Sequence, residues 1–210
     1  MSGNFILTIG REYGSGGREI GENIATQLGI RCIDKELLKA TAENSGLSEN
    51  ILKQYDEVGS KSLLYSLVTG LTPSSNSVPP LPVQVYLEQF KTIQYLADRE
   101  SCVFIGRCSD YALRDHENLV RVFIHAPLPD RIRRICRRNG LDERTARARI
   151  AKLDRSRATY YNQFTSQKWG STKNYDLTLD TGKVGIDGAV SVILRYIELF
   201  RENRKQAQPI

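Results

Sequence analysis

The sequence predicts an α/β protein built on a parallel sheet with helices on both faces. Short apolar runs alternate with helical periodicity from end to end, which is typical of this class. A glycine-rich turn joins the first apolar run to the first helical pattern. A Pro-rich stretch before the third strand and an Arg-rich helix pair after the fourth interrupt the alternation. Insertions at the carboxyl ends of parallel strands lie where such sheets bind ligands.

Five segments have the short apolar pattern of buried strands. The first runs directly into glycines, and the second ends at Asp34. The expected strands are residues 5–9, 30–33, 102–105, 119–126 and 176–180. Near-continuous apolar runs suit strands that are covered on both faces.

The helical segments follow from the spacing of apolar residues. After the glycine turn, Ile20, Ile24, Ala25 and Leu28 recur at helical spacing, and Gly29 ends the pattern. Further helices are expected at residues 35–44, 48–54, 83–99, 127–138 and 142–167. A closing helix carries one apolar stripe, formed by Ile186, Ala189, Val190, Ile193, Leu194 and Ile197. Residues 69–82 hold four of the seven prolines without periodicity, which predicts a loop.

Composition excludes several classes of protein. A chain of 210 residues with 26% charged and 40% hydrophobic residues is neither disordered nor fibrous, and fits one domain with small insertions. Its apolar runs of about five residues are far shorter than the roughly 20 that a membrane span needs. The N-terminus lacks a basic region, so no signal peptide is expected, and four cysteines without metal-binding spacing indicate reduced thiols in a cytoplasmic protein. The net charge of +6 suits an anionic ligand.

The turn at residues 10–19 reads GREYGSGGRE and has the chemistry of a phosphate-binding loop. A helix that begins there directs unpaired N–H groups and a positive dipole end at the turn. Gly14, Gly16 and Gly17 let an anion approach the backbone. The dinucleotide motif is not matched, because Glu19 stands where it needs glycine. Walker A is not matched either, because Gly17 stands at its lysine position and Arg18 at its Ser/Thr position. The alternative is a structural turn without a ligand.

Residues 8–21 and 33–37 resemble the opening of the bacterial cytidylate kinase-like family. The likeness continues in the segments 104–108, 154–158, 160–161, 169–170 and 174–177. The resemblance implies a P-loop nucleoside monophosphate kinase fold with a five-stranded parallel sheet. It implies one kinase domain over residues 1–210, with a helical acceptor-binding insert at about 35–100 and an arginine-rich lid at about 127–170. The implied reaction transfers the γ-phosphoryl group of ATP, with Mg²⁺, to a nucleoside monophosphate, CMP or dCMP being the first candidate.

The resemblance also implies which residues bind the nucleotide. Cytidylate kinase proper has lysine at the position of Gly17 and threonine at that of Glu19. We therefore expect Arg18 to supply the missing charge, and Glu19 or Ser15 to supply an oxygen for Mg²⁺. The expected nucleotide-binding set is Arg11, Gly14, Ser15, Gly16, Gly17, Arg18 and Glu19, together with Thr181 and Lys183 after the last strand. A plain strand-to-helix turn is the alternative for the last two.

On the acceptor side, the resemblance points to Asp34, its neighbour Lys35, and Arg107. Arg107 belongs to a Gly-Arg-Asp motif in which Cys108 replaces the aspartate.

Phosphoryl transfer requires positive charge around the moving group, and eight arginines lie between positions 131 and 149. Arg131, Arg134 and Arg138 share one helix face. Asp154 and Arg157 match the Asp-x-x-Arg of the family's lid helix. The expected catalytic residues are Arg18, Arg131, Arg134, Asp154 and Arg157.

A second hypothesis is a nucleotide-binding regulatory or sensor module without phosphoryl transfer, because the P-loop lysine is missing. Small-molecule nucleotides are the expected partners. Nucleic acid is not expected, because the Arg-rich stretch lacks aromatic residues for stacking, and no membrane partner is expected. The aromatic residues after that stretch, from Tyr160 to Trp169, are expected to pack the lid helix. His116 and His125 are expected to be structural.

Overall fold

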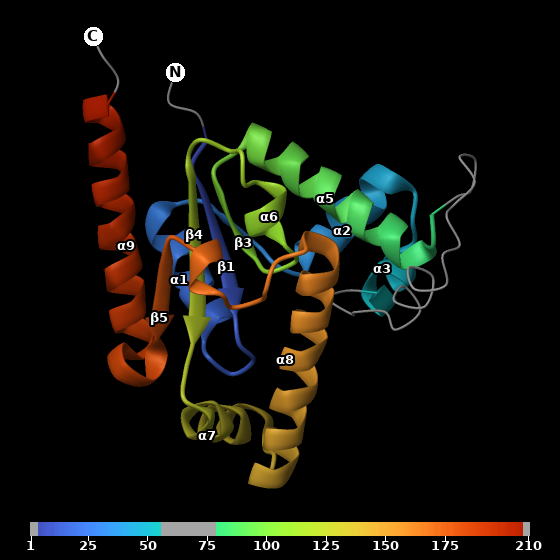
Figure 1. Ribbon diagram of the computed structural model, residues 1–210, viewed down its shortest axis with the longest axis vertical. Coiled ribbons are helices and arrows are strands. Elements are labelled where there is room, and N and C mark those ends of the chain that lie inside the picture. Colours follow the sequence, from blue (N-terminus) through green and yellow to red (C-terminus); the bar gives the residue numbers. More distant parts are fainter. Residues whose placement is uncertain (1–3, 56–78, 208–210) are drawn as a thin grey trace.

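A computed structural model describes residues 4–55 and 79–207 of the chain. Five strands form one sheet in the order β2-β3-β1-β4-β5, and every neighbouring pair is parallel (Figure 1). The strands are β1 (Ile6–Arg11), β2 (Arg31–Ile33), β3 (Cys102–Ile105), β4 (Leu119–His125) and β5 (Leu177–Asp180). The strand β1 is central, so its carboxyl end lies between those of β3 and β4.

The helices alternate with the strands along the chain. They are α1 (Gly17–Leu28), α2 (Glu36–Ser45), α3 (Glu49–Tyr55), α5 (Leu81–Arg99), α6 (Ser109–Ala112), α7 (Leu128–Asn139), α8 (Glu143–Thr165) and α9 (Thr181–Ala207), with a 3₁₀ turn at Thr172–Asn174. The helix α9 contains a kink at Gly185. Among the described residues, no helix is long and apolar enough to cross a membrane.

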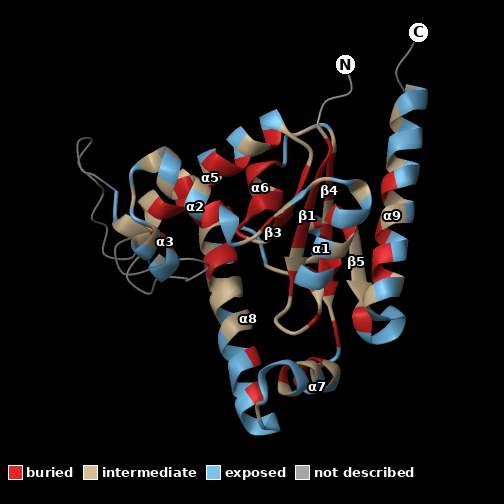
Figure 2. Ribbon diagram, turned by 180° about the vertical axis from the view of Figure 1, so that it is seen from behind, coloured by how far each residue is buried: buried red, intermediate tan, exposed pale blue. Residues whose placement is uncertain are grey.

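Alternating side chains of the strands build a separate core on each face of the sheet. Leu7 and Ile9 of β1 pack with α1 and α9, whereas Ile6, which precedes them and points to the opposite face, packs with α2, α5 and α6. The central strands β1, β3 and β4 are among the most deeply buried parts of the molecule, and the exposed ends of α7 and α8 extend beyond the sheet (Figure 2). Burial on both faces explains why the strands have uninterrupted apolar sequences.

The structure confirms the parallel sheet and the alternation that the sequence predicts. The third strand has the predicted bounds, and the other described elements differ from prediction by a few residues at their ends. The short helix α6 was not predicted, because four residues are too few to show helical periodicity. Leu81 and Pro82, predicted to be in the loop 69–82, begin α5, since proline is tolerated in the first helical turn. Residues 69–78 of that loop lie outside the described residues.

The first turn of α1 packs closely against the sheet because of a glycine. A Cβ atom at Gly21 would lie 2.4 Å from Ile105 Cδ1 and 3.1 Å from Ile9 Cδ1. This close approach sets the distance between α1 and the strands that flank the glycine turn.

We therefore expect Gly21→Val to lower the free energy of unfolding by about 1–3 kcal/mol, because the added carbons overpack the core. Gln27→Val places the same side chain at an exposed position of α1 and should cost less than about 1 kcal/mol. Urea unfolding followed by circular dichroism measures both. Equal losses for the two variants would contradict the packing argument.

Candidate active site

The glycine turn between β1 and α1 has the backbone of an anion-binding loop. Gly14 and Gly16 have φ values of 84° and 92°, in the left-handed region that favours glycine. At Gly17 a Cβ atom would lie 2.6 Å from Arg11 Cβ, so only glycine fits there without movement. The first amides of α1 have no acceptor within the helix, and the helix dipole makes this end positive. The turn therefore offers donors and a favourable field to an anion.

Side chains of α7, α8 and α9, and one within the turn, donate hydrogen bonds to carbonyl oxygens of this turn. Arg134 Nη1 donates to Gly14 O at 2.7 Å, and Arg157 Nη1 donates to Arg11 O at 3.1 Å. Thr181 Oγ1 donates to Ser15 O at 2.7 Å. Within the turn, Ser15 Oγ donates to Glu12 O at 2.9 Å. With these carbonyls engaged, the amide side of the turn is available to a ligand.

The turn opens into a cavity of about 550 Å³ at the carboxyl ends of the strands. Of the side chains that line it and that the structure describes, eight are basic and three are acidic. The basic ones are Arg11, Arg18, Lys35, Arg107, Arg134, Arg138, Arg149 and Arg157; the acidic ones are Glu12, Glu19 and Asp34. Partial burial lowers the pKa of Arg134 from its ordinary value, against the opposing effect of Glu19. Such an excess of positive charge favours a ligand with several negative charges.

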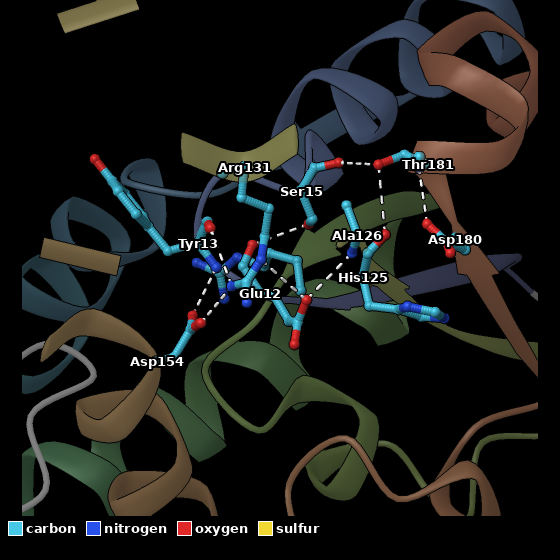
Figure 3. A network of polar contacts seen from close by, with 12 residues as sticks. Glu12, Tyr13, Ser15, His125, Ala126, Arg131, Asp154, Asp180 and Thr181 are labelled. Carbon is cyan, nitrogen blue, oxygen red and sulfur yellow. Dashed lines mark hydrogen bonds and ion pairs between the residues drawn. The ribbon is translucent and has the colours of Figure 1, made fainter. Parts of the chain in front are cut away.

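Arg131 and Asp154 lie behind the turn and hold its backbone (Figure 3). Asp154 accepts a hydrogen bond from Tyr13 N at 2.7 Å through Oδ1 and from Arg131 Nη1 at 2.5 Å through Oδ2. Arg131 Nε also lies 3.4 Å from Glu12 Oε2, which in turn accepts a hydrogen bond from Ala126 N. The side chains of Arg131 and Asp154 are only 10% and 17% exposed. This network connects α7 and α8 to the glycine turn.

The Tyr13 side chain lies between the turn and the Arg-rich helices. Its ring packs against the apolar residues shared by α7 and α8. The guanidinium carbons of Arg138, Arg149 and Arg157 lie 5.8–5.9 Å from the ring centroid, at the outer limit of a cation–π contact. Tyr13 thus gathers three of the cavity's arginines around one aromatic ring.

Arg18, in the first turn of α1, points toward Asp34 on one side of the cavity. Its Nε lies 2.8 Å from Glu22 Oε1 and 3.4 Å from Asp34 Oδ2. The hydrogen bond to Glu22, with a smaller contribution from Asp34, raises the pKa of Arg18 above its ordinary value. The side chain is 50% exposed and lines the cavity.

Asp34 and Arg107 form an ion pair on the same side, with 2.9 Å between Oδ1 and Nη1. The Arg107 side chain is only 3% exposed. Arg107 and Cys108 both have positive φ values, 54° and 56°, which are uncommon for residues other than glycine. Strained backbone of this kind is frequent at functional sites. Cys108 is buried and packs with Tyr86, Tyr160 and Tyr161.

The structure brings most of the predicted site residues to one cavity. Those that line it are Arg11, Gly14, Gly16, Gly17, Arg18, Glu19, Asp34, Lys35, Arg107, Arg134 and Arg157. Ser15 and Thr181 are buried and act on the backbone of the turn, and Lys183 is exposed at the start of α9. Arg131 and Asp154 contact the turn from behind. Sequence reasoning had not singled out Glu12, Tyr13 or Arg149, and it had preferred Arg131 to Arg138, which lines the cavity.

The aromatic residues after the Arg-rich stretch do pack α8, as expected. The Tyr86 and Phe164 rings are stacked with 4.2 Å between centroids, and Tyr160 packs edge-on against both. Tyr160 OH donates to Gln89 Oε1 at 3.1 Å, which joins α8 to α5. Trp169 packs edge-on against Phe123 of β4.

One carboxylate at the turn fits Mg²⁺, which binds one or two protein oxygens and keeps several waters. It belongs to Glu19, which lines the cavity from the first turn of α1. The Ser15 hydroxyl is buried, donates to Glu12 O and is not among the groups that line the cavity. Among the described residues, no group of three or more His, Cys, Asp or Glu side chains could hold a metal by itself.

A small cavity of about 20 Å³ adjoins the main one and shares Arg11, Arg107 and Arg157 with it. Asp110 of α6 lies in its wall and accepts a hydrogen bond from Tyr161 OH at 2.7 Å. Burial raises the pKa of Asp110 to about 6, against the opposing hydrogen bond from Tyr161.

We expect Asp154→Ala to lower the free energy of unfolding by about 3 kcal/mol, because it leaves the Arg131 guanidinium largely buried beside Glu12 alone. Arg195→Ala removes one partner of an exposed pair on α9 and should change stability by less than about 0.5 kcal/mol. Chemical denaturation measures both. A loss for Asp154→Ala no larger than that of the control would contradict the role of the network.

Asp110 predicts a pH dependence of stability. A folded-state pKa above the unfolded value means that the native state binds the proton more tightly. Proton binding by Asp110 therefore stabilises the folded state fully at pH values below the unfolded-state pKa, and this stabilisation is lost as the pH rises through about 6. Asp110→Asn should accordingly be more stable than the parent at about pH 8, with a much smaller difference at about pH 4.5. Denaturant midpoints at both pH values test this; a pH-independent difference would contradict it.

Comparison with known proteins places the chain in a family. Residues 6–183 match the model of the cytidylate kinase-like family. The cytidylate kinase of Methanopyrus kandleri is 21% identical over 206 residues, which cover 94% of this chain and 95% of that one. That of Methanoculleus marisnigri is 30% identical over 94 residues, only 45% of this chain and 51% of that enzyme. The match thus spans about half the length of the latter relative. Both relatives are archaeal, whereas the sequence had suggested a bacterial family.

Solved structures agree on the fold. An uncharacterized protein from Eubacterium ventriosum superposes with a TM-score of 0.72 at 28% identity, covering 93% of this chain and 98% of that one. A gluconokinase from Sinorhizobium meliloti has a TM-score of 0.53 at 14% identity, covering 99% and 98%. A shikimate kinase from Bacteroides thetaiotaomicron has a TM-score of 0.52 at 13% identity, covering 92% of this chain and 98% of that one. With the sheet order and the glycine turn, these likenesses establish a P-loop kinase fold, and the match over residues 6–183 shows that the chain belongs to the cytidylate kinase-like family.

Proposed function

We propose that the protein is an ATP-dependent phosphotransferase that transfers the γ-phosphoryl group to a nucleoside monophosphate, with CMP or dCMP as the first acceptor. The observation that carries the proposal is the cavity of about 550 Å³ that the glycine turn shares with Asp34 and Arg107. Phosphoryl transfer depends mainly on positioning and on positive charge, and this cavity provides both.

The nucleotide phosphates would bind at the amides of Gly14–Glu19, at the amino end of α1. Arg18, Arg134 and Arg157 would place positive charge around them, and Arg11 lines the same side of the cavity. Thr181 would act indirectly, through its hydrogen bond to Ser15 O. Lys183, exposed at the start of α9, would border the adenine.

The acceptor would bind at Asp34, Lys35 and Arg107. We assign α2, α3 and α5 to the acceptor-binding insert, and α7 and α8 to the lid. In the reaction, an oxygen of the acceptor's phosphate forms a bond to the γ-phosphorus. The bond from that phosphorus to the β,γ-bridging oxygen breaks, and ADP leaves. Arg131 and Asp154 would serve this step by holding the backbone of the glycine turn.

Mg²⁺ bound with ATP would neutralise charge on the β- and γ-phosphate oxygens. Glu19 would hold it, directly or through water, and the buried Ser15 hydroxyl would supply a second oxygen only after leaving Glu12 O. The four free cysteines support the proposal of a cytoplasmic enzyme. Its proposed partners are small nucleotides.

One observation favours a second candidate, a nucleotide-binding module without phosphoryl transfer. Gly17 stands where related loops have lysine, and the nearest substitute, Arg18, is paired with Glu22 and Asp34. Calorimetry with ATP, beside a coupled ADP-release assay over CMP, dCMP, UMP, AMP and GMP, separates the candidates. Turnover with one of these acceptors supports the kinase. ATP binding without turnover on any of them supports the module.

Arg18→Ala is expected to lower kcat by about 10- to 100-fold, because a charge-assisted bond to phosphate is worth about 1.5–3 kcal/mol. Arg18→Lys should restore little, since lysine is a point charge and cannot reproduce the planar guanidinium. Arg195→Ala, on the exposed face of α9, serves as the matched control and should leave kcat unchanged. A change within twofold for Arg18→Ala would mean that the missing lysine is replaced elsewhere.

A further inference from the structure

One carboxylate links the nucleotide side of the cavity to the acceptor side. Asp34 Oδ1 lies 2.9 Å from Arg107 Nη1, and Asp34 Oδ2 lies 3.4 Å from Arg18 Nε. The three residues come from the carboxyl ends of neighbouring strands, since Asp34 follows β2, Arg107 follows β3, and Arg18 lies in the helix that follows β1. The side chain of Asp34 is only 14% exposed. We call this arrangement the Asp34 bridge.

The two arginines of the bridge are held very differently. The Arg107 side chain is 3% exposed and also donates to Ile105 O at 3.3 Å. The Arg18 side chain is 50% exposed, and its pairs with Glu22 and Asp34 are of the kind that solvent screens strongly. Arg18 also stands in the first turn of α1, where the helix dipole disfavours a cation. Arg18 is therefore the partner that a stronger anion can remove from Asp34.

Such an anion would arrive at the backbone of Arg18 itself. The amide of Arg18 belongs to the anion-binding first turn, and its side chain lines the same cavity as Gly14, Gly16 and Gly17. A polyphosphate bound there competes with Asp34 and Glu22 for one guanidinium. Charge-assisted bonds to phosphate are stronger than half-exposed side-chain pairs.

We propose that the Asp34 bridge couples the two substrates. In the empty site Asp34 holds Arg18 on the acceptor side. Nucleotide binding moves the Arg18 guanidinium to the phosphates, and Asp34 Oδ2 then accepts a hydrogen bond from a hydroxyl or amino group of the acceptor. The inference rests on the proposed function. It adds a preferred order of binding, because nucleotide binding frees Asp34 Oδ2 for the acceptor. Asp34 thereby acts on nucleotide affinity as a positioning residue, although it lies on the acceptor side.

Nucleotide binding has to take the Arg18 guanidinium from Asp34, so weakening Asp34's hold on Arg18 should tighten nucleotide binding. The experiment is a double-mutant cycle on the full chain, with ATP as the probe and calorimetry as the readout, in the absence of any acceptor. Asp34→Asn should lower the Kd for ATP about fivefold when Arg18 is present. In the Arg18→Ala background the same change should alter the Kd by less than about twofold.

The cycle separates the bridge from a simple field effect. Removing a negative charge from the cavity favours ATP in any background, so equal factors with and without Arg18 would overturn the bridge while leaving ATP binding intact. Weaker ATP binding by Asp34→Asn would overturn it as well. Failure of the parent protein to bind ATP would instead overturn the proposed function, and the bridge with it.

Glu22→Gln provides a second variant that leaves the core and the Asp34–Arg107 pair untouched. It releases Arg18 from its other carboxylate and should tighten ATP binding about twofold, again only when Arg18 is present. No change, or a change that persists in Arg18→Ala, would count against the bridge. Thermal melts of every variant confirm that the compared proteins are folded.

Discussion

Repulsion between like charges is the constraint on which the rest of the site depends. Eight basic side chains and three carboxylates surround one cavity in the described part of the chain. Residues 128–165, which span α7, α8 and the turn between them, contain 11 basic and 4 acidic residues, so their net charge of 11 − 4 = +7 exceeds the +6 of the whole protein. Folding brings this charge against the positive end of α1. The arrangement is stable only where carboxylates, carbonyl oxygens or a bound anion offset it.

The charges of the arginines are offset by different kinds of contact. Arg131 is neutralised behind the turn by Asp154 and Glu12 and stabilises the backbone. Arg134 and Arg157 bind carbonyl oxygens of the turn while they line the cavity. Arg138 and Arg149 lie near the Tyr13 ring. The positive charge is therefore held in place before any ligand binds, which reduces the reorganisation that a polyphosphate would require.

The sequence predicts the sheet and the glycine turn well because both are local patterns. Apolar runs, the spacing of glycines and the start of a helix are all contained within a few residues. The same reasoning could place Arg131, Arg134 and Arg138 on one helix face, but it could not tell which end of that face meets the cavity. That choice depends on Asp154 and Glu12, which lie 23 and 119 residues from Arg131 in the sequence. The positive φ values of Arg107 and Cys108 likewise have no signal in the local sequence, because neither residue is glycine.

The hydrogen bond from Thr181 to the carbonyl of Ser15 joins residues 166 positions apart. The neighbours of β1 in the sheet are also distant, since β3 begins at Cys102 and β4 at Leu119. The glycine turn leaves the ribosome before all of these partners, and its last contact arrives only with β5 and α9. A nascent chain therefore carries the turn without its support until β5 and α9 have emerged, and closing so long a loop is entropically costly and slow. Nucleotide affinity should consequently appear only after β5 and α9 have folded against the rest of the sheet.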